Sequence, residues 1–137
     1  MALSVRDAHF PGRAPIDAYG NGGFRFAGMS HRGSLLCLPS GIYGWDGAAD
    51  GKLTELDLAR VFAEADKIEV LLVGTGLELV PLAQPLRQRL REARIIADSM
   101  STGAAVRTYN VVLAEGRAVA AALIAVVTAP LRPYLRA

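Results

Sequence analysis

Residues 69–76 read Glu-Val-Leu-Leu-Val-Gly-Thr-Gly, and residues 95–103 read Ile-Ile-Ala-Asp-Ser-Met-Ser-Thr-Gly. Each stretch contains a short apolar run, which is typical of a buried strand, and ends in glycine or hydroxyl residues. An arginine-rich segment with the spacing of a helix lies between them, and another helix is predicted to follow. Two strands that both end at such helix starts are predicted to form one rim, where a ligand or a partner would sit.

The spacing of apolar residues predicts three helices. The first begins at Thr54, whose hydroxyl can cap the first turn, while Asp57 adds favourable negative charge there. The second is announced by Pro81 and Pro85, since a helix tolerates proline only before or within its first turn, and it ends near residue 94. The third covers about residues 102–114, with Gly116 as its predicted stop.

Short strands are predicted before the first helix. Residues 16–19 and 24–27 flank a Gly-Asn-Gly-Gly turn and are predicted to form a β-hairpin. Residues 29–33 are predicted to form a second turn, which strands at 34–38 and 42–45 follow. The amino-terminal half is therefore predicted to contribute an antiparallel β-layer.

One domain is expected, because 137 residues can bury most of their apolar surface around a single core. The predicted organisation is an irregular arm at residues 1–15, a single α/β domain at 16–128 and a tail at 129–137. The last strand is predicted at residues 119–127. Residues 118–131 are nearly all apolar, but this run is shorter than the ~20 residues that a membrane-spanning helix needs.

Composition and charge narrow the class of protein. Apolar residues make up 52% of the chain and charged residues 20%, as in globular domains. The formal charge of +2 is too small to imply a polyanionic partner. The amino terminus lacks the apolar core of a signal peptide, and the single cysteine, Cys37, is predicted to be a buried thiol in a reducing compartment. A cytoplasmic location is expected, including a peripheral position at the inner membrane.

The predicted rim is the candidate site. Free amides at a helix start carry partial positive charge, so a carboxylate, phosphate or carbonyl oxygen could dock beside the hydroxyls of Thr75, Ser101 and Thr102. Arg107 and Asn110 lie three residues apart and are predicted to point the same way from the third helix. The alternatives are a tight glycine turn, a capped helix and an internal hydrogen-bond network. The candidate rim consists of Gly74, Thr75, Gly76, Asp98, Ser101, Thr102, Arg107 and Asn110.

The sequence shows no catalytic, cofactor or metal constellation, so no cofactor is expected. The glycine turn at 74–76 is not a dinucleotide fingerprint, because leucine occupies position 79, and no Gly-Lys-Ser/Thr follows to make a phosphate-binding loop. His9 and His31 have no cysteine or carboxylate at a metal-ligand spacing.

An arginine stripe on the second helix raises the question of a nucleic-acid site. Its members are Arg87, Arg91 and Arg94. The stripe lacks the interleaved aromatic residues of a single-strand binder, and nearby glutamates dilute its charge. A solvated helix face is therefore predicted, with no nucleic-acid partner.

The motifs together resemble those of the family called domain of unknown function 498, over roughly residues 16–127. They are Leu71-Leu72-Val73-Gly74-Thr75-Gly76, the segment from Asp98 to Asn110, Glu115-Gly116-Arg117 and Ala121-Ala122-Leu123-Ile124. That family includes a mitochondrial assembly factor of respiratory complex I and an animal adipogenesis-associated protein. The resemblance implies a three-layer α/β fold, with a central mixed sheet, helices and an additional amino-terminal antiparallel β-layer. It implies no established catalytic residues.

Two functions remain open from the sequence. The first is a non-enzymatic binding or assembly protein that has protein partners, such as a membrane-complex subunit, and helps that complex mature from the cytoplasmic side. The second is a small-molecule or anion-binding protein, or an enzyme, that uses the candidate rim. The oligomeric state is left open.

Overall fold

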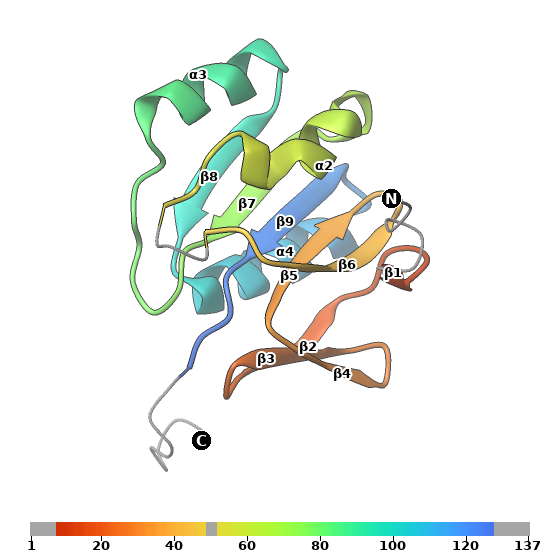
Figure 1. The fold of residues 1–137 in the computed structure, drawn as a ribbon. Coiled ribbons are helices and arrows are strands. Elements are labelled where there is room, and N and C mark those ends of the chain that lie inside the picture. Colours follow the sequence, from red (N-terminus) through yellow and green to blue (C-terminus); the bar gives the residue numbers. More distant parts are fainter. Residues whose placement is uncertain (1–7, 49–51, 128–137) are drawn as a thin grey trace.

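Strands and helices fold into three layers (Figure 1). The computed structural model describes residues 8–48 and 52–127. In these ranges a six-stranded sheet lies at the centre, helices cover one face, and a helix together with a three-stranded sheet covers the other. This is the three-layer α/β fold with an additional antiparallel β-layer that the sequence predicts. The predicted tail, residues 129–137, lies outside the described residues.

The central sheet is mixed. Its strands are β1 (Ala8–Phe10), β5 (Ser34–Leu38), β6 (Gly41–Trp45), β7 (Val70–Gly74), β8 (Ile96–Met100) and β9 (Val119–Leu123). Their order across the sheet is β1-β6-β5-β9-β7-β8. Strand β7 runs parallel to both β8 and β9, whereas β5 is antiparallel to β6 and β9. Both β7 and β9 are covered on two faces, which accounts for their continuous apolar sequences.

Alternate side chains of the central strands enter two hydrophobic cores. In β9, Val119, Ala121 and Leu123 face one core, while Ala120 and Ala122 face the other. The first core is closed by one helix and the three-stranded sheet, and the second by the remaining helices. The covering helices are α4 (Thr102–Ala114) on the first face, and α2 (Ala59–Ala63) and α3 (Gln84–Glu92) on the second.

The three-stranded sheet consists of β2 (Ile16–Gly20), β3 (Gly23–Phe26) and β4 (Met29–Arg32). The predicted hairpin is confirmed, since β2 and β3 pair antiparallel around Asn21 and Gly22, which have φ angles of 53° and 81°. The prediction of a turn at residues 29–33 is wrong. Ala27 and Gly28, with φ angles of 50° and 76°, already form a tight turn that leads directly into β4.

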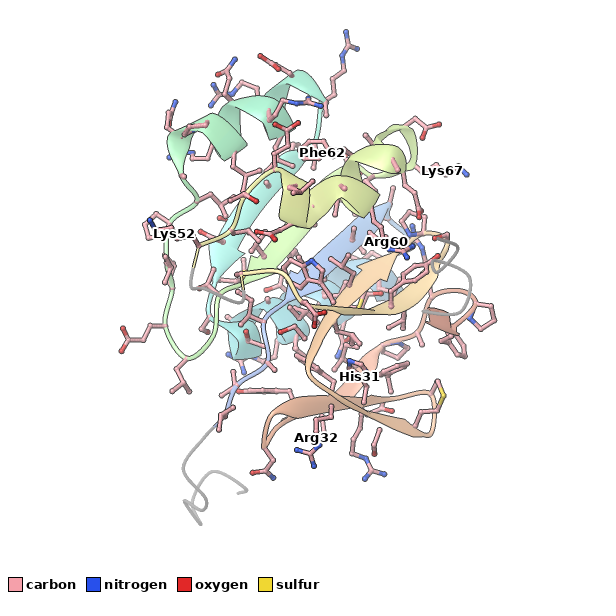
Figure 2. All side chains as sticks on the ribbon, in the orientation of Figure 1. His31, Arg32, Lys52, Arg60, Phe62 and Lys67 are labelled. Atoms are coloured by element: carbon pink, nitrogen blue, oxygen red, sulfur yellow. The ribbon has the colours of Figure 1, made fainter. Side chains whose placement is uncertain are left out.

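The first predicted helix is broken into short pieces. They are the 3-10 turn η1 (Leu56–Leu58), α2, and the 3-10 turn η2 (Ala65–Lys67). Thr54 and Asp57 still cap this region, because the Thr54 amide donates to the Asp57 carboxylate (2.8 Å) and the Asp57 amide donates to the Thr54 hydroxyl (3.4 Å). Phe62 extends from α2 toward α3 (Figure 2), where the Arg89 guanidinium lies 4.6 Å from the ring centre. The third predicted helix is confirmed as α4.

Three strand boundaries differ from the prediction. Strand β1 lies within the segment predicted to be an irregular arm and pairs with β6. Strand β8 is longer than the predicted residues 95–97. Strand β9 is shorter than the predicted 119–127, because the Ala125 amide donates to the Ser34 hydroxyl (2.9 Å) instead of to a neighbouring strand.

Cys37 lies in the middle of β5 and has no exposed surface. Burial raises the pKa of the Cys37 thiol from 9.0 to about 12, against a smaller opposing effect of its hydrogen bond with Tyr109. The thiol is therefore protonated at neutral pH. Its position confirms the prediction of a buried core cysteine.

We expect Cys37 to resist Ellman's reagent in the folded protein at about pH 8 and to react once denaturant unfolds the chain, because only the thiolate attacks. The folded pKa is raised above the unfolded value, so the associated stability is complete below pH 9.0 and is lost as the pH rises toward about 12. Urea unfolding at increasing pH should show this loss, and Cys37→Ala should reduce it. Rapid labelling of the folded protein would contradict the burial of the thiol.

Candidate functional site

The glycine turn after β7 and the start of α4 form a closed junction. The Thr75 amide donates to the Met100 carbonyl (2.8 Å), which holds the turn to the end of β8. The Gly76 amide donates to the Thr102 hydroxyl (2.9 Å), and the Thr102 amide donates back to the Gly76 carbonyl (2.8 Å). The turn and the helix start therefore bind each other directly.

Thr102 is the central group of this junction. Its side chain is fully buried, and its hydroxyl accepts from Gly76 while donating to the Ile124 carbonyl at 2.7 Å. A Cβ atom at Gly74 would lie 2.9 Å from the Thr102 Cα and 3.2 Å from the Ala105 Cβ. Glycine at position 74 is therefore required for α4 to pack this closely against β7.

The Thr75 hydroxyl orders the segment that follows the turn, residues 77–83, which we call the strap. This hydroxyl accepts from the Val80 amide (2.9 Å), and the carbonyl oxygens of Glu78 (2.6 Å) and Met100 (3.0 Å) lie within reach of its proton. The strap then passes β8 on the side away from β7 and leads into α3 (Figure 1).

Ser101 and Asn110 also bond within the protein. Ser101 caps α4 by accepting from the Ala104 amide at 3.3 Å. Asn110 accepts from the Ile16 amide (2.9 Å) and donates to the Ile16 carbonyl (2.8 Å). Asn110 therefore attaches the three-stranded sheet to α4.

Asp98 and Arg107 are exposed and lie apart, on β8 and α4. Three residues turn a helix by about 300°, so Arg107 and Asn110 lie about 60° apart around α4. Arg107 is exposed, whereas Asn110 bonds to Ile16 of β2. The structure thus brings together the glycine turn, Ser101 and Thr102, and it engages them in internal hydrogen bonds. A ligand role for the candidate rim stays a prediction, since a ligand would have to displace these bonds.

A groove of about 450 Å³ lies beside the junction, between the strap, α3 and β8. Its volume falls in the range of roughly 300–1,000 Å³ that ligand pockets occupy. Asp98, one of the predicted rim residues, lines this groove. The lining residues are Pro81 and Leu82 of the strap, Arg87, Leu90 and Arg91 of α3, and residues 95–99.

Exposed apolar side chains gather on the segments that border this groove. In the strap, Leu77, Leu79 and Val80 are 68%, 56% and 51% exposed, and Ile96 of β8 is 64% exposed. These four residues are half of the large apolar side chains that are exposed in the described part of the chain. Exposed apolar patches on folded proteins are typical of interaction sites, so these segments are a candidate interaction surface.

The arginines of α3 divide between two sides of the helix. Arg89 bonds with Glu55 of the preceding segment at 2.8 Å, whereas Arg87 and Arg91 line the groove. All three arginines of the stripe are exposed, in agreement with the predicted solvated face, but their spacing does not indicate the groove. The available signal is the change from the apolar pair at 95–96 to Asp98 and a serine, which is typical of a strand at a sheet edge.

Residues 8–48 and 52–127 contain no metal-binding cluster and no membrane-spanning helix. In these ranges no group of three histidine, cysteine or acidic side chains is arranged to hold a metal ion. Every helix there is too short or too polar to cross a membrane. The His31 ring nitrogen lies 3.1 Å from the Ser34 carbonyl oxygen.

Sequence comparison places the chain in a known family. The profile of the family described as "Protein of unknown function (DUF498/DUF598)" matches residues 16–124. The chain belongs to this family. The DUF498 chain is 40% identical over 122 residues to an uncharacterized protein of Rhodobacter capsulatus, covering 89% of this chain and 93% of the relative. It is 30% identical over 122 residues to mouse NADH dehydrogenase (ubiquinone) 1 alpha subcomplex assembly factor 3, covering 89% of this chain and 66% of the mouse protein.

Solved structures of similar proteins have the same fold. The crystal structure described as an outer membrane protein from Bartonella henselae is 66% identical with a TM-score of 0.81, covering 86% of this chain and 99% of that one. The Rpa2829 protein from Rhodopseudomonas palustris is 48% identical with a TM-score of 0.75, covering 96% and 95%. A Bordetella pertussis protein described as an Mth938-like domain is 28% identical with a TM-score of 0.68, covering 81% and 85%. The DUF498 chain therefore has the Mth938-like fold.

We expect Thr102→Val to destabilise the protein by about 1–3 kcal/mol, because valine keeps the shape but leaves the Gly76 amide and the Ile124 carbonyl without their partner. Thr108→Val, on the same helix and half-buried, is the matched control and should change stability by less than about 0.5 kcal/mol. Urea denaturation measures both. Equal stability of the two variants would show that the junction does not depend on the Thr102 hydroxyl.

Proposed function

We propose that this DUF498 chain is a protein-binding assembly factor that acts without catalysing a reaction. The observation that carries the proposal is the 30% identity with the mouse protein named as an assembly factor of NADH dehydrogenase. The shared region covers 89% of this chain. The chain spans 66% of the mouse protein's length, so the transfer of its role is a proposal about the common domain.

The surface of the protein is suited to binding another protein. A factor that only holds a subunit during assembly needs an accessible apolar surface, and it needs no acid, base or nucleophile. The exposed side chains of the strap and Ile96 provide such a surface beside the groove. The polar groups of the glycine turn and Thr102 already have internal partners, which favours the groove over the candidate rim.

We further propose that the partner is a subunit of a membrane-bound NADH dehydrogenase and that the chain acts from the cytoplasmic side as a peripheral protein. The mouse relative is named as an assembly factor of NADH dehydrogenase, which supports this choice of partner. The description of the Bartonella henselae relative names the outer membrane instead. Separating the inner and outer membrane fractions distinguishes the two locations.

The test is chromosomal tagging in the organism that encodes the chain, followed by mild cross-linking, purification and mass spectrometry. We expect NADH dehydrogenase subunits to co-purify from the cytoplasm and inner membrane. Deletion of the gene should lower the amount of the assembled complex on native gels and its NADH:quinone activity in membranes. An enzymatically inactive but normally assembled complex would indicate a different role.

A tagged chain that carries Arg25→Glu on β3 is a suitable control for nonspecific charge effects, since this exposed residue lies outside the groove. It should retain the co-purified subunits and restore assembly in the deletion strain. The proposal is contradicted if the deletion leaves the complex unchanged and no subunit is enriched over the untagged strain.

A further inference from the structure

The open edge of β8 presents unpaired backbone groups. Within residues 8–48 and 52–127, strand β8 is the last strand of the central sheet and pairs only with β7 (Figure 1). The Ile96 amide donates to the Glu69 carbonyl (2.9 Å), and the Met100 carbonyl accepts from the Thr75 amide (2.8 Å). Successive residues of a strand direct their amide and carbonyl groups to opposite neighbours. The backbone groups of the intervening Ala97 and Ser99 therefore face away from β7.

The strap does not satisfy this edge. Among the described residues, no backbone hydrogen bond joins residues 77–83 to β8. The groove lies beside the strand and is lined by the strap, by α3 and by residues 95–99. Native edge strands are commonly protected by proline, lysine or a β-bulge. Strand β8 contains no proline or lysine, its five pairs with β7 keep a continuous register, and its one charged residue is Asp98, which shares the face of Ile96. The edge is therefore suited to accept one more strand.

The two faces of β8 offer different chemistry to an added strand. Leu71 pairs with Ala97 and belongs to the core under α3, so Ala97 and Ser99 point to the α3 face. Arg87 and Arg91 line the groove on that face. Ile96 and Asp98 point to the opposite face, and both are exposed, Ile96 by 64%. An added strand would therefore meet cations on one side, and an apolar side chain next to a carboxylate on the other.

A second copy of the chain fits this edge poorly. Two β8 strands paired antiparallel around a twofold axis keep both α3 helices on the same face of the joined sheet. The groove arginines, Arg87 and Arg91, would then approach their own copies, and like charges at an interface oppose association. A partner segment with acidic side chains has the complementary charge.

We propose that the edge of β8 receives an extended segment of a partner protein in which acidic residues alternate with apolar residues. The main chain of the segment bonds to Ala97 and Ser99, its acidic side chains face Arg87 and Arg91, and its apolar side chains pack beside Ile96. This is recognition by β-strand addition. The inference rests on the proposed function, because it specifies the chemistry of the partner that an assembly factor would hold.

The first test uses synthetic peptides and the isotope-labelled wild-type chain. The probe is an eight-residue peptide of alternating valine and glutamate, and its matched control alternates valine and lysine. We expect the glutamate peptide to shift the amide signals of Ala97 and Ser99 and to slow their hydrogen exchange. The lysine peptide should bind at least about tenfold more weakly, a difference of ~1.4 kcal/mol. Added salt should weaken the binding of the glutamate peptide.

A third peptide isolates the backbone contribution. In this peptide the alternate amides that face β8 are N-methylated, which removes those hydrogen-bond donors and leaves the peptide side chains unchanged. We expect its binding to fall by at least about tenfold. Methylation of the other amides is the control and should preserve binding. This comparison leaves the protein unaltered and therefore does not depend on the folding of a variant.

The second test alters the groove charges. We expect Arg87→Glu combined with Arg91→Glu to weaken binding of the glutamate peptide by at least about tenfold and to favour the lysine peptide. Arg25→Glu combined with Arg32→Glu makes the same charge change on the three-stranded sheet, away from α3, and should leave binding unchanged (Figure 2). Amide spectra confirm that each variant is folded.

Several results would overturn the inference. They are equal binding of both peptides, signal shifts confined to other strands, and no binding at millimolar peptide. Protection of Ala97 and Ser99 that grows with protein concentration alone would assign the edge to a second copy. If the groove double variant still co-purifies NADH dehydrogenase subunits as well as wild type does, the β8 inference fails while the proposed function stands. If peptide binding follows the prediction but no subunit co-purifies, the proposed function fails instead.

Discussion

The hydroxyl of Thr102 is the contact on which the geometry of this protein depends. It accepts from the turn that follows β7 and donates to the chain just after β9, while its own amide bonds to the same turn. One buried side chain therefore fixes the ends of two parallel central strands relative to the first turn of α4. The close approach of α4 over Gly74 is possible because that position has no side chain. Similar hydroxyl-rich helix starts bind ligands in other α/β proteins, but here the protein uses the same groups for its own packing.

This junction also determines where an interaction surface can form. Because the end of β7 is closed by α4, accessible polar and apolar groups are found farther out, at β8 and the strap. The Thr75 hydroxyl bonds to the backbone of Glu78 and Val80 in the strap, and these bonds fix where the strap begins beside β8. An ordered sheet edge with an adjacent apolar surface is well suited to holding a partner chain, since little backbone order is lost on the side of the scaffold. The family resemblance to an assembly factor and the geometry of the edge thus support the same class of function.

The sequence predicted the layers of the fold better than the role of individual polar residues. Periodicity located α4 and the hairpin at Asn21, because helix spacing and left-handed turn residues are local signals. It missed β4, whose polar Met-Ser-His-Arg sequence resembles a loop and becomes a strand only by pairing with β3. Thr75, Ser101 and Thr102 were recognised as a cluster, but capping, internal bonding and ligand binding require the same residue types. The edge position of β8 depends on strand order, which is set by contacts between distant parts of the chain.

The position of β9 has a consequence for synthesis of the chain on the ribosome. This strand follows all other central strands in sequence, yet it lies between β5 and β7 in the sheet. In the part of the chain that the structure describes, the strand group β1-β6-β5 and the group β7-β8 share no direct strand pairing, so they cannot be joined until residues 119–123 have left the exit tunnel. Until then the apolar strands β5 and β7 each have an unpaired backbone edge exposed to the cell. Folding of the domain is therefore completed only after translation of its last strand, and nascent chains that stop before this point are natural clients for chaperones.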